Sequence, residues 1–414
     1  MILYDLAIEL YGLAVRSAAP FNPKAKAWVE GRYRIFARMR EAIAPTDRVV
    51  WFHAASLGEF EQGRPLMEAF RRRYPEHKIL LTFFSPSGYS VRKDYKGADY
   101  IFYLPLDTPG RVRRFLDAAH PEAAVFVKYE YWKNYLMQLH RRGIPTYVVS
   151  AVFDPSQLFF RRIGAPYRRL LRCFDRLFVQ NERSRELLAS IGIDNVTVCG
   201  DTRFDRVIQI VREAGPPDRR IVDFAGRGGL FIAGSTWPPD DEIILYLIER
   251  YPMVRFLVAP HELSEAKVAS LCRRIAACGA SVVRFTGGET PDALAVARVM
   301  VLDAIGQLSR AYRYGAFAYI GGGFGVGIHN TLEAATFGMP VAFGPNYKRF
   351  SEAVGLIEAG AAQSISGKEA AAEWLGQMLA DPALLERRSR AAESFVLSGE
   401  GAVDKILDYG LLRS

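Results

Sequence analysis

Short apolar runs alternate with amphipathic segments along most of the chain. In the first half, buried strands are predicted at residues 48–55, 78–84, 123–129, 146–153, 176–180 and 196–200. Amphipathic segments lie between these runs, at residues 61–73, 108–119, 131–142 and 182–191. Continuous apolar strands separated by helices are typical of a parallel, doubly wound α/β sheet that is covered on both faces.

A second series of apolar runs follows, at residues 230–235, 254–260, 280–285, 299–303, 316–322 and 340–345. A chain of 414 residues is too long for one hydrophobic core. We therefore expect two Rossmann-like domains with a cleft between them, at residues 1–205 and 229–395. Residues 206–228, rich in glycine and proline, are interpreted as a linker. A last helix within residues 396–414 is expected to pack back on the first domain.

The first residues of the chain predict an amphipathic helix. Leucines recur at helical spacing at positions 3, 6, 10 and 13, while Asp5, Glu9 and Arg16 lie elsewhere on the helix. The segment lacks the pattern of a signal peptide and is too short and too charged to span a bilayer. We expect it to lie in a membrane interface, to pack on its own domain, or to do both.

Charge is distributed unevenly. Residues 1–205 contain 32 Lys and Arg against 22 Asp and Glu, whereas residues 206–414 contain 22 against 23, so the halves carry +10 and −1. The basic half is expected to meet an anionic partner, which could be a phosphorylated substrate, a membrane surface or nucleic acid. The four cysteines have no C-x-x-C spacing and no H-E-x-x-H motif occurs. A reducing compartment fits, and no zinc site is expected.

The most informative stretch is GGGFGVGIHNTLEAATFGMPVAFGP, residues 321–345. It predicts a strand end, a glycine-rich loop and a helix that begins near Asn330, with Glu333 at the spacing of a capping box. A glycine loop leading into a helix suggests a phosphate site at the end of a parallel strand. The dinucleotide fingerprint G-x-G-x-x-G fails in every register. The alternative is a tight turn in which Asn330 and Glu333 only cap the helix.

Two acidic residues follow predicted strands of the first domain. Glu59 comes after the strand at 48–55 and has capping-box spacing from Ser56. A carboxylate at this edge of the sheet could deprotonate a hydroxyl if burial raised its pKa, although it could equally be a helix cap. Glu130 follows another strand, within KYEYWKN at 128–134. No G-x-S-x-G motif accompanies Ser56, so a hydrolase is not indicated.

Many of these segments resemble one family, the 3-deoxy-D-manno-octulosonic acid (Kdo) transferases of lipopolysaccharide synthesis. The segments that carry the resemblance are WFHAASLGEFEQGRPL (51–66), LTFFSPSG (81–88), residues 102–134, NVTVCGDTRFD (195–205), FIAGSTW (231–237), VAPHE (258–262), LDAIGQL (302–308) and residues 321–345. The resemblance implies the two-domain GT-B glycosyltransferase fold. It also implies transfer of Kdo from CMP-Kdo to a lipid A precursor, with inversion of the anomeric centre and without a catalytic metal.

By this resemblance, Glu59 matches the presumed general base and Glu130 matches the second carboxylate of the family's E-x-E-x-W-P-N motif. Lys128 stands in place of the first carboxylate and Lys133 in place of the proline, so a role for two acids in this loop is in doubt.

In the second domain, the resemblance places CMP-binding residues on three segments. Pro260 and His261 occupy the place of a Pro-Arg pair that contacts CMP, and the arginine is lost here. Residues that match a loop lining the cytidine pocket are Ile305, Gly306 and Gln307. Residues that match the nucleotide motif N-x-x-E are Asn330, Thr331, Leu332 and Glu333. In this motif Glu333 would accept hydrogen bonds from ribose hydroxyls, and Asn330 would help to hold phosphate.

The expected partners are therefore CMP-Kdo, a lipid A precursor and the anionic surface of the inner membrane, with no nucleic acid. The expected location is the cytoplasmic face of that membrane, as a peripheral or monotopic protein. Two other classes of protein stay open: a GT-B glycosyltransferase that uses a UDP-sugar, and a non-catalytic membrane-bound binding protein. A preference for cytidine over uridine nucleotides would distinguish a Kdo transferase from a glycosyltransferase that uses a UDP-sugar. A turnover assay would distinguish it from a non-catalytic binding protein.

Overall fold

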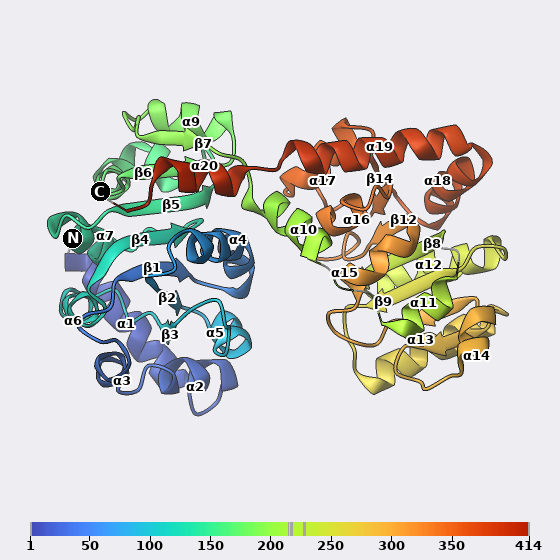
Figure 1. Cartoon of the computed structure of the whole chain (residues 1–414), viewed down its shortest axis with the longest axis horizontal. Coiled ribbons are helices and arrows are strands. Elements are labelled where there is room, and N and C mark those ends of the chain that lie inside the picture. Colours follow the sequence, from blue (N-terminus) through green and yellow to red (C-terminus); the bar gives the residue numbers. More distant parts are fainter. Residues whose placement is uncertain (1, 214, 216–217, 227–228, 413–414) are drawn as a thin grey trace. The chain divides into compact units, whose positions relative to one another are not determined.

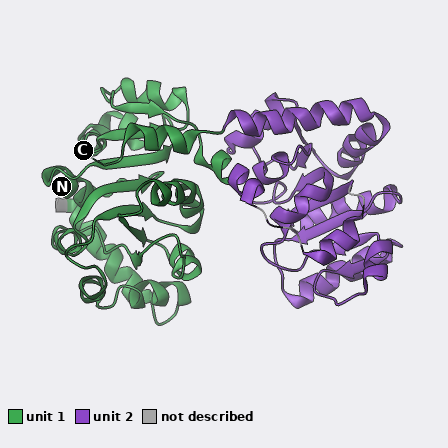
Figure 2. Ribbon diagram, viewed as in Figure 1, with its two compact units in different colours: residues 1–206, 400–414 green, residues 207–399 purple. Residues whose placement is uncertain are grey.

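A computed structural model describes residues 2–213, 215, 218–226 and 229–412. The described residues form two compact units, residues 1–206 with 400–414, and residues 207–399 (Figure 2). The segment interpreted as a linker, 206–228, contains the end of one helix and the whole of another, α11 (Arg219–Ala225). Its positions 214, 216, 217, 227 and 228 lie outside the described residues.

Unit 1, within the described residues, is built on a seven-stranded parallel sheet of order β3-β2-β1-β4-β5-β6-β7 (Figure 1). Its strands are β1 (Val49–Ala54), β2 (Lys78–Phe83), β3 (Tyr100–Tyr103), β4 (Pro121–Val127), β5 (Thr146–Ala151), β6 (Arg176–Val179) and β7 (Val196–Val198). Its helices are α1 (Ile2–Ala18), α2 (Pro23–Glu30), α3 (Ile35–Ala42), α4 (Leu57–Arg73), α5 (Pro86–Arg92), α6 (Pro109–Ala119), α7 (Lys133–Arg141), η1 (Leu158–Phe160), η2 (Arg162–Tyr167), α8 (Arg168–Leu171), α9 (Glu182–Ala189) and α20 (Ala402–Tyr409). Helix α10 (Thr202–Glu213) begins in unit 1 and ends in unit 2.

Residues of one strand point alternately to opposite faces of the sheet, and side chains on both faces of this sheet are buried. Trp51 of β1 packs with Phe126 of β4 on one face, and Phe52 belongs to the core of the other face. This second core also contains Val403 and Ile406 of α20, so the end of the chain packs on unit 1.

The N-terminal helix α1 is fixed to unit 1 by polar contacts of its inner face. The Tyr4 hydroxyl donates to Asp107 at 2.6 Å, and Lys133 Nζ lies 2.8 Å from Asp5 Oδ1. Burial raises the pKa of Asp107 to about 6. The outer face of α1 carries the exposed leucines at positions 3, 6, 10 and 13. No helix in the described part of the chain is long and apolar enough to cross a membrane.

The described part of unit 2 repeats the architecture, with a parallel sheet of order β10-β11-β9-β8-β12-β13-β14. Its strands are β8 (Leu230–Thr236), β9 (Phe256–Pro260), β10 (Val282–Arg284), β11 (Val299–Val301), β12 (Gly315–Ile320), β13 (Val341–Phe343) and β14 (Ala362–Ser364). Besides α11, its helices are α12 (Pro238–Arg250), α13 (Glu265–Ala277), α14 (Pro291–Val296), α15 (Leu308–Ala311), η3 (Tyr312–Tyr314), α16 (Leu332–Ala335), α17 (Ser351–Glu358), α18 (Lys368–Ala380) and α19 (Pro382–Ser398). The α/β fold class and the two Rossmann-like domains predicted from the sequence are confirmed.

Candidate functional site

The strand order places the two acidic segments of unit 1 next to each other. From β1 the chain proceeds to β2 and β3 on one side, and from β4 it proceeds to β5 on the other. Strands β1 and β4 are neighbours, with His53 paired to Phe126. The position between them is therefore the topological switch point of the sheet, where ligands bind outside the carboxyl ends of the strands. Glu59 follows β1 and Glu130 follows β4 at this point.

Glu130 is held by a buried histidine and a tryptophan. Its Oε2 lies 3.1 Å from His53 Nε2 and accepts a hydrogen bond from Trp132 Nε1 at 2.5 Å. His53 is completely buried, and its Nδ1 lies 2.9 Å from the Thr82 hydroxyl. A carboxylate only accepts, so His53 Nε2 is the donor to an ionised Glu130, while Nδ1 faces both the Thr82 hydroxyl and, at 3.1 Å, the Thr82 carbonyl oxygen. The hydrogen bonds thus orient Glu130 from the interior of unit 1.

Glu59 forms the capping box that its spacing from Ser56 predicts. Its Oε2 accepts from the Ser56 N–H at 2.9 Å, and the Ser56 hydroxyl caps α4 in return. Its pKa is raised, first because burial disfavours the charged form and next because of the negative charge of Glu130, against an opposing effect of His53. A carboxylate that stays ionised but has a raised pKa is a better general base. The capping contact and a catalytic role are therefore compatible.

Two lysines occupy the places where the family resemblance led us to expect a carboxylate and a proline. Lys128 has a left-handed backbone conformation, with φ of 71°, directly before the turn that returns Glu130 to His53. Lys133 is buried and makes the ion pair with Asp5 of α1. Glu130 therefore lies at the switch point of unit 1 without a second acid in its loop. Lys133 holds α1 on unit 1 through its ion pair with Asp5.

In unit 2, the glycine-rich loop lies at the switch point between β8 and β12. A Cβ on Gly321 would overlap the backbone of Ser235, and one on Gly323 would overlap that of Gly344. Close packing of the loop on neighbouring strand ends therefore explains these two glycines. Buried Asp240 fixes the loop by accepting hydrogen bonds from Gly322 N at 2.8 Å and from the Tyr319 hydroxyl at 2.6 Å.

The motif N-x-x-E differs from its predicted form in the local hydrogen bonds. Asn330 Oδ1 accepts from Leu332 N at 3.0 Å, and Glu333 Oε1 accepts from the Asn330 side chain at 3.1 Å, so these two residues do not form the predicted capping box. Glu333 Oε2 accepts from the Ser309 hydroxyl at 2.6 Å. The sequence suggested a phosphate site at the start of a helix. Helix α16 has only four residues, so its dipole would contribute little to such a site.

The residues matched to the cytidine pocket, and the two middle residues of the nucleotide motif, differ in how they are placed. Ile305 is 90% exposed, Gly306 has φ of 81°, and Gln307 has a buried Oε1 that has no donor among the described residues. Thr331 is buried with an unpaired hydroxyl, and Leu332 is a core residue that can offer only its backbone. Exposed Ile305 is therefore the side chain of this set that a base could contact directly, whereas the Gln307 oxygen is covered in this structure.

His261 belongs to a stack of three aromatic rings. Its ring lies 4.5 Å from the ring of Trp237 and 4.5 Å from that of His329, centroid to centroid, while Pro260 precedes it at the end of β9. Trp237 Nε1 donates to His329 Nε2 at 3.0 Å. Burial, and then His261, lower the pKa of His329, which fits a neutral imidazole that accepts this bond.

Sequence reasoning did not identify the partners of these residues. The contact between His53 and Glu130 spans 77 positions, and that between Asp240 and Gly322 spans 82. Their only sequence signal is that each residue lies at or just after the end of a strand on either side of a switch point. Among the described residues, no three His, Cys, Asp or Glu side chains gather closely enough to hold a metal ion.

Comparisons with known proteins agree with this geometry. Residues 30–206 match the family described as 3-deoxy-D-manno-octulosonic-acid transferase (kdotransferase). The 3-deoxy-D-manno-octulosonic acid transferase of Bordetella pertussis is 29% identical, over 96% of this chain and 97% of its own length. That of Haemophilus influenzae is 26% identical, over 94% and 91%.

Solved structures support the fold alone. The UDP-GlcNAc 2-epimerase of Neisseria meningitidis, bound to UDP-GlcNAc, superposes with a TM-score of 0.61 at 16% identity, covering 87% of this chain and 98% of its own. The UDP-GlcNAc 2-epimerase of Methanocaldococcus jannaschii gives 0.56 at 14% identity, covering 88% and 100%. The order of the matching motifs, the two Rossmann-like units and the near full-length relatives lead to one conclusion. Over nearly its whole length the chain is similar to 3-deoxy-D-manno-octulosonic acid transferases, and its residues 30–206 match the model of that family.

Proposed function

We propose that the protein transfers Kdo from CMP-Kdo to a hydroxyl of a lipid A precursor in lipopolysaccharide synthesis. The observation that carries this proposal is the position of Glu59 and Glu130 at the switch point of unit 1, with Glu130 fixed by His53 and the pKa of Glu59 raised. The relatives named for this activity, which match almost the whole chain, support it.

In the proposed reaction, Glu59 is the general base. A sugar hydroxyl is a poor nucleophile, so its proton must leave as the new bond forms. The acceptor oxygen bonds to the anomeric carbon of Kdo, its proton passes to Glu59, and the bond between the anomeric carbon and the phosphate oxygen breaks to release CMP. Attack opposite the leaving group inverts the anomeric centre. Glu130 maintains a negative charge that raises the pKa of Glu59.

Unit 2 binds the donor in this proposal. Glu333, held by Ser309 and Asn330, accepts hydrogen bonds from the ribose hydroxyls. The exposed side chain of Ile305 packs on the cytosine, and the Gln307 side chain, whose oxygen is buried and has no donor among the described residues, turns outward to accept from its amino group. His261, on the platform of Trp237 and His329, takes the place of the family's arginine beside CMP.

The proposed location is the cytoplasmic surface of the inner membrane. The exposed leucines of α1 form one apolar stripe, and residues 1–205 carry a net charge of +10. An apolar helix face beside basic residues is the composition of a protein that lies on an anionic membrane.

The direct test is to incubate the full chain with CMP-Kdo and a lipid A precursor and to measure the mass of the lipid product. An added Kdo, with release of CMP, is expected. Parallel incubation with UDP-sugars serves as the control. Transfer from a UDP-sugar in place of CMP-Kdo, or no transfer by a folded, CMP-binding protein, would contradict the proposal.

A further inference from the structure

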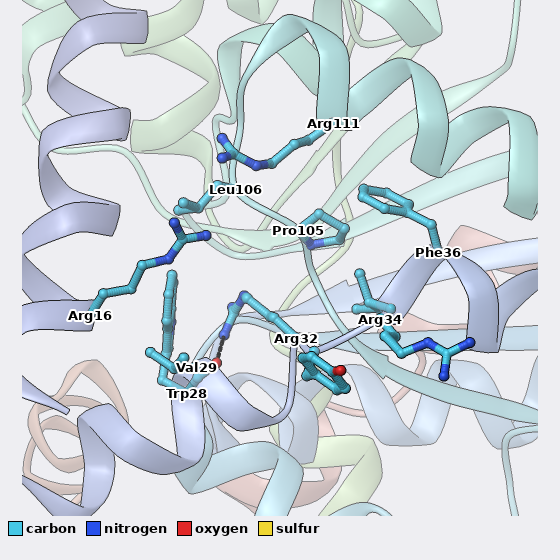
Figure 3. Close-up of a pocket in the computed structure, with 11 residues that line it drawn as sticks. Arg16, Trp28, Val29, Arg32, Arg34, Phe36, Pro105, Leu106 and Arg111 are labelled. Carbon is cyan, nitrogen blue, oxygen red and sulfur yellow. Dashed lines mark hydrogen bonds between the residues drawn. The ribbon is translucent and has the colours of Figure 1, made fainter. Parts of the chain in front are cut away.

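Unit 1 contains a cavity of about 400 Å³ that is unusually rich in arginine. It lies between α1, the segment of α2 and α3, and the loop that follows β3. Figure 3 shows the guanidinium groups of Arg16 and Arg111 pointing toward the same space near Leu106, with Arg32 beside Trp28. Arg34 also lines the cavity, but its guanidinium points away from the other three (Figure 3). Three cations from separate segments therefore converge on one cavity.

Arg32 has no carboxylate partner among the described residues. Its guanidinium donates to the carbonyl oxygens of Leu104 at 2.9 Å, Trp28 at 3.0 Å and Phe84 at 2.8 Å. Burial lowers its pKa to about 9, so it still carries its charge at neutral pH. A buried charge is normally balanced by an opposite one, because leaving water is otherwise costly. The cavity therefore retains a positive charge that an anion could neutralise.

The cavity wall also holds an unused donor. Trp28 is 5% exposed, and its buried indole N–H has no acceptor in the described residues. Most buried polar groups in proteins have a hydrogen-bond partner, so this indole N–H is a candidate donor to a ligand. Arg111, by contrast, is already paired, since its Nη1 donates to Glu9 Oε1 at 2.5 Å and to the Thr108 hydroxyl at 3.0 Å. An incoming anion would compete with Glu9 for this arginine.

The surroundings of the cavity indicate which kind of anion it takes. Arg16 lies one helical turn after Leu13. Leu13 belongs to the apolar stripe of α1, and its side chain is 56% exposed. Arg32 also lies over the ring of Phe84, which packs on Trp132 with ring centroids 4.8 Å apart, and Trp132 donates to Glu130. The cavity thus adjoins the helix that carries the exposed leucines, and two aromatic rings connect its Arg32 with the candidate catalytic carboxylate.

We propose that Arg16, Arg32 and Arg111 form a binding site for a phosphate group on a lipid headgroup, and that its occupant is a phosphate monoester of the acylated sugar acceptor. The assignment to the acceptor rests on the proposed function. The phosphate fits the fork-shaped donors of arginine, which bind such oxygens in pairs. Binding there would position the acceptor sugar so that its hydroxyl reaches Glu59.

The test uses full-length Arg16→Gln and Arg111→Gln, with Arg34→Gln as the matched control on the same cavity. Flotation with vesicles of a zwitterionic lipid to which phosphatidic acid is added measures binding of a phosphate monoester without any sugar transfer. Each of the first two variants should weaken this binding about tenfold, as expected for loss of a charge-assisted hydrogen bond, and Arg34→Gln should change it little. Glu9→Gln should strengthen it, because Arg111 is released. Arg32 is left intact because it also holds three carbonyl oxygens of the fold.

Two further arms identify the source of the phosphate. Vesicles of equal charge that contain phosphatidylglycerol, a diester, should show a smaller dependence on Arg16 and Arg111, and inorganic phosphate should not compete at matched concentration. In turnover assays, the KM for a phosphorylated acceptor should rise in both variants while the KM for a dephosphorylated acceptor stays constant. Equal loss on all anionic lipids would overturn the site, and competition by inorganic phosphate would overturn its assignment to a lipid headgroup. If the variants weaken phosphatidic acid binding but the protein transfers no Kdo, the proposed function fails and the phosphate site stands.

Discussion

His53 and Glu130 are 77 positions apart in the sequence, yet their side chains meet at 3.1 Å in the interior of unit 1. The parallel pairing of β1 with β4 brings them together, because both residues lie at the carboxyl ends of adjacent strands. Trp132 completes the arrangement by donating to the same carboxylate oxygen. Glu130 is therefore a fixed charge beside Glu59, and several consequences for catalysis can be measured.

Replacing Glu59 by Gln should reduce turnover by roughly 10²- to 10⁴-fold, the usual contribution of general base catalysis. The amide retains size and can still accept a hydrogen bond from Ser56, but it cannot take the acceptor proton. CMP affinity should stay constant because the residues proposed to bind the donor belong to unit 2. Initial rates, calorimetric CMP binding and the thermal midpoint give the three readouts. Near wild-type turnover would leave Glu59 as a helix cap, and a collapse in stability would show that its cap dominates.

Replacing Glu130 by Gln should move the acidic limb of the kcat profile to lower pH. The negative charge of Glu130 raises the pKa of Glu59, so its removal must lower that pKa. Glu59 then stays ionised in more acidic solution, although it becomes a weaker base and the plateau rate should fall. A pH–rate profile measures both effects. Glu68→Gln is a control on the same helix as Glu59, in contact with Arg64, and an equal shift in that variant would contradict the assignment.

The fold was largely predictable from the sequence because its strands are buried on both faces and stand out as apolar runs. Strands β3 and β14 were not predicted, since β3 is only four residues long and the three residues of β14, Ala362 to Ser364, are mostly polar. Both are edge strands, where one neighbouring strand is enough to define the pairing. Helices α2 and α3 were also missed, in a region that the sequence marked only by its basic residues.

The sequence offered candidate site residues one by one, but not the contacts among them. Spacing gave the capping box of Ser56 and Glu59, because that contact is local. The same reasoning was wrong for Asn330 and Glu333, since Ser309, from another segment, takes one oxygen of Glu333 and α16 is a single turn. Contacts such as those of His53 and Asp240 depend on strand order, which periodicity alone does not determine.

Replacing Glu333 by Ala should weaken CMP binding by about 1–3 kcal/mol, the range for removing a hydrogen bond to a charged group. The structure adds a control, because Ser309 donates to Glu333 Oε2 and holds its orientation. Ser309→Ala should therefore weaken binding less than Glu333→Ala and in the same direction. Calorimetry with CMP and with UMP would measure both variants. Unchanged CMP affinity in Glu333→Ala would mean that this carboxylate only supports the local turn.

Membrane attachment should depend on the outer face of α1. Replacing Leu10 and Leu13 by Ser removes two half-exposed apolar side chains without touching Tyr4 or Asp5, which hold the helix on unit 1. Full burial of a leucine contributes about 1.5–3 kcal/mol, so partial insertion of two should make binding to anionic vesicles at least about tenfold stronger than in the double variant. Met253→Ser, at an exposed apolar position in unit 2, is the control.

Salt separates the two contributions to this attachment. Attraction between basic residues and anionic lipid is screened as ionic strength rises, whereas apolar insertion is not. Wild-type protein should therefore retain part of its vesicle binding in high salt, and the Leu10 and Leu13 double variant should lose nearly all of it there while keeping some at low salt. Flotation at a series of salt concentrations measures both curves. If the double variant and wild type coincide at every salt concentration, the exposed stripe of α1 does not enter the membrane, and the basic surface alone would have to account for attachment.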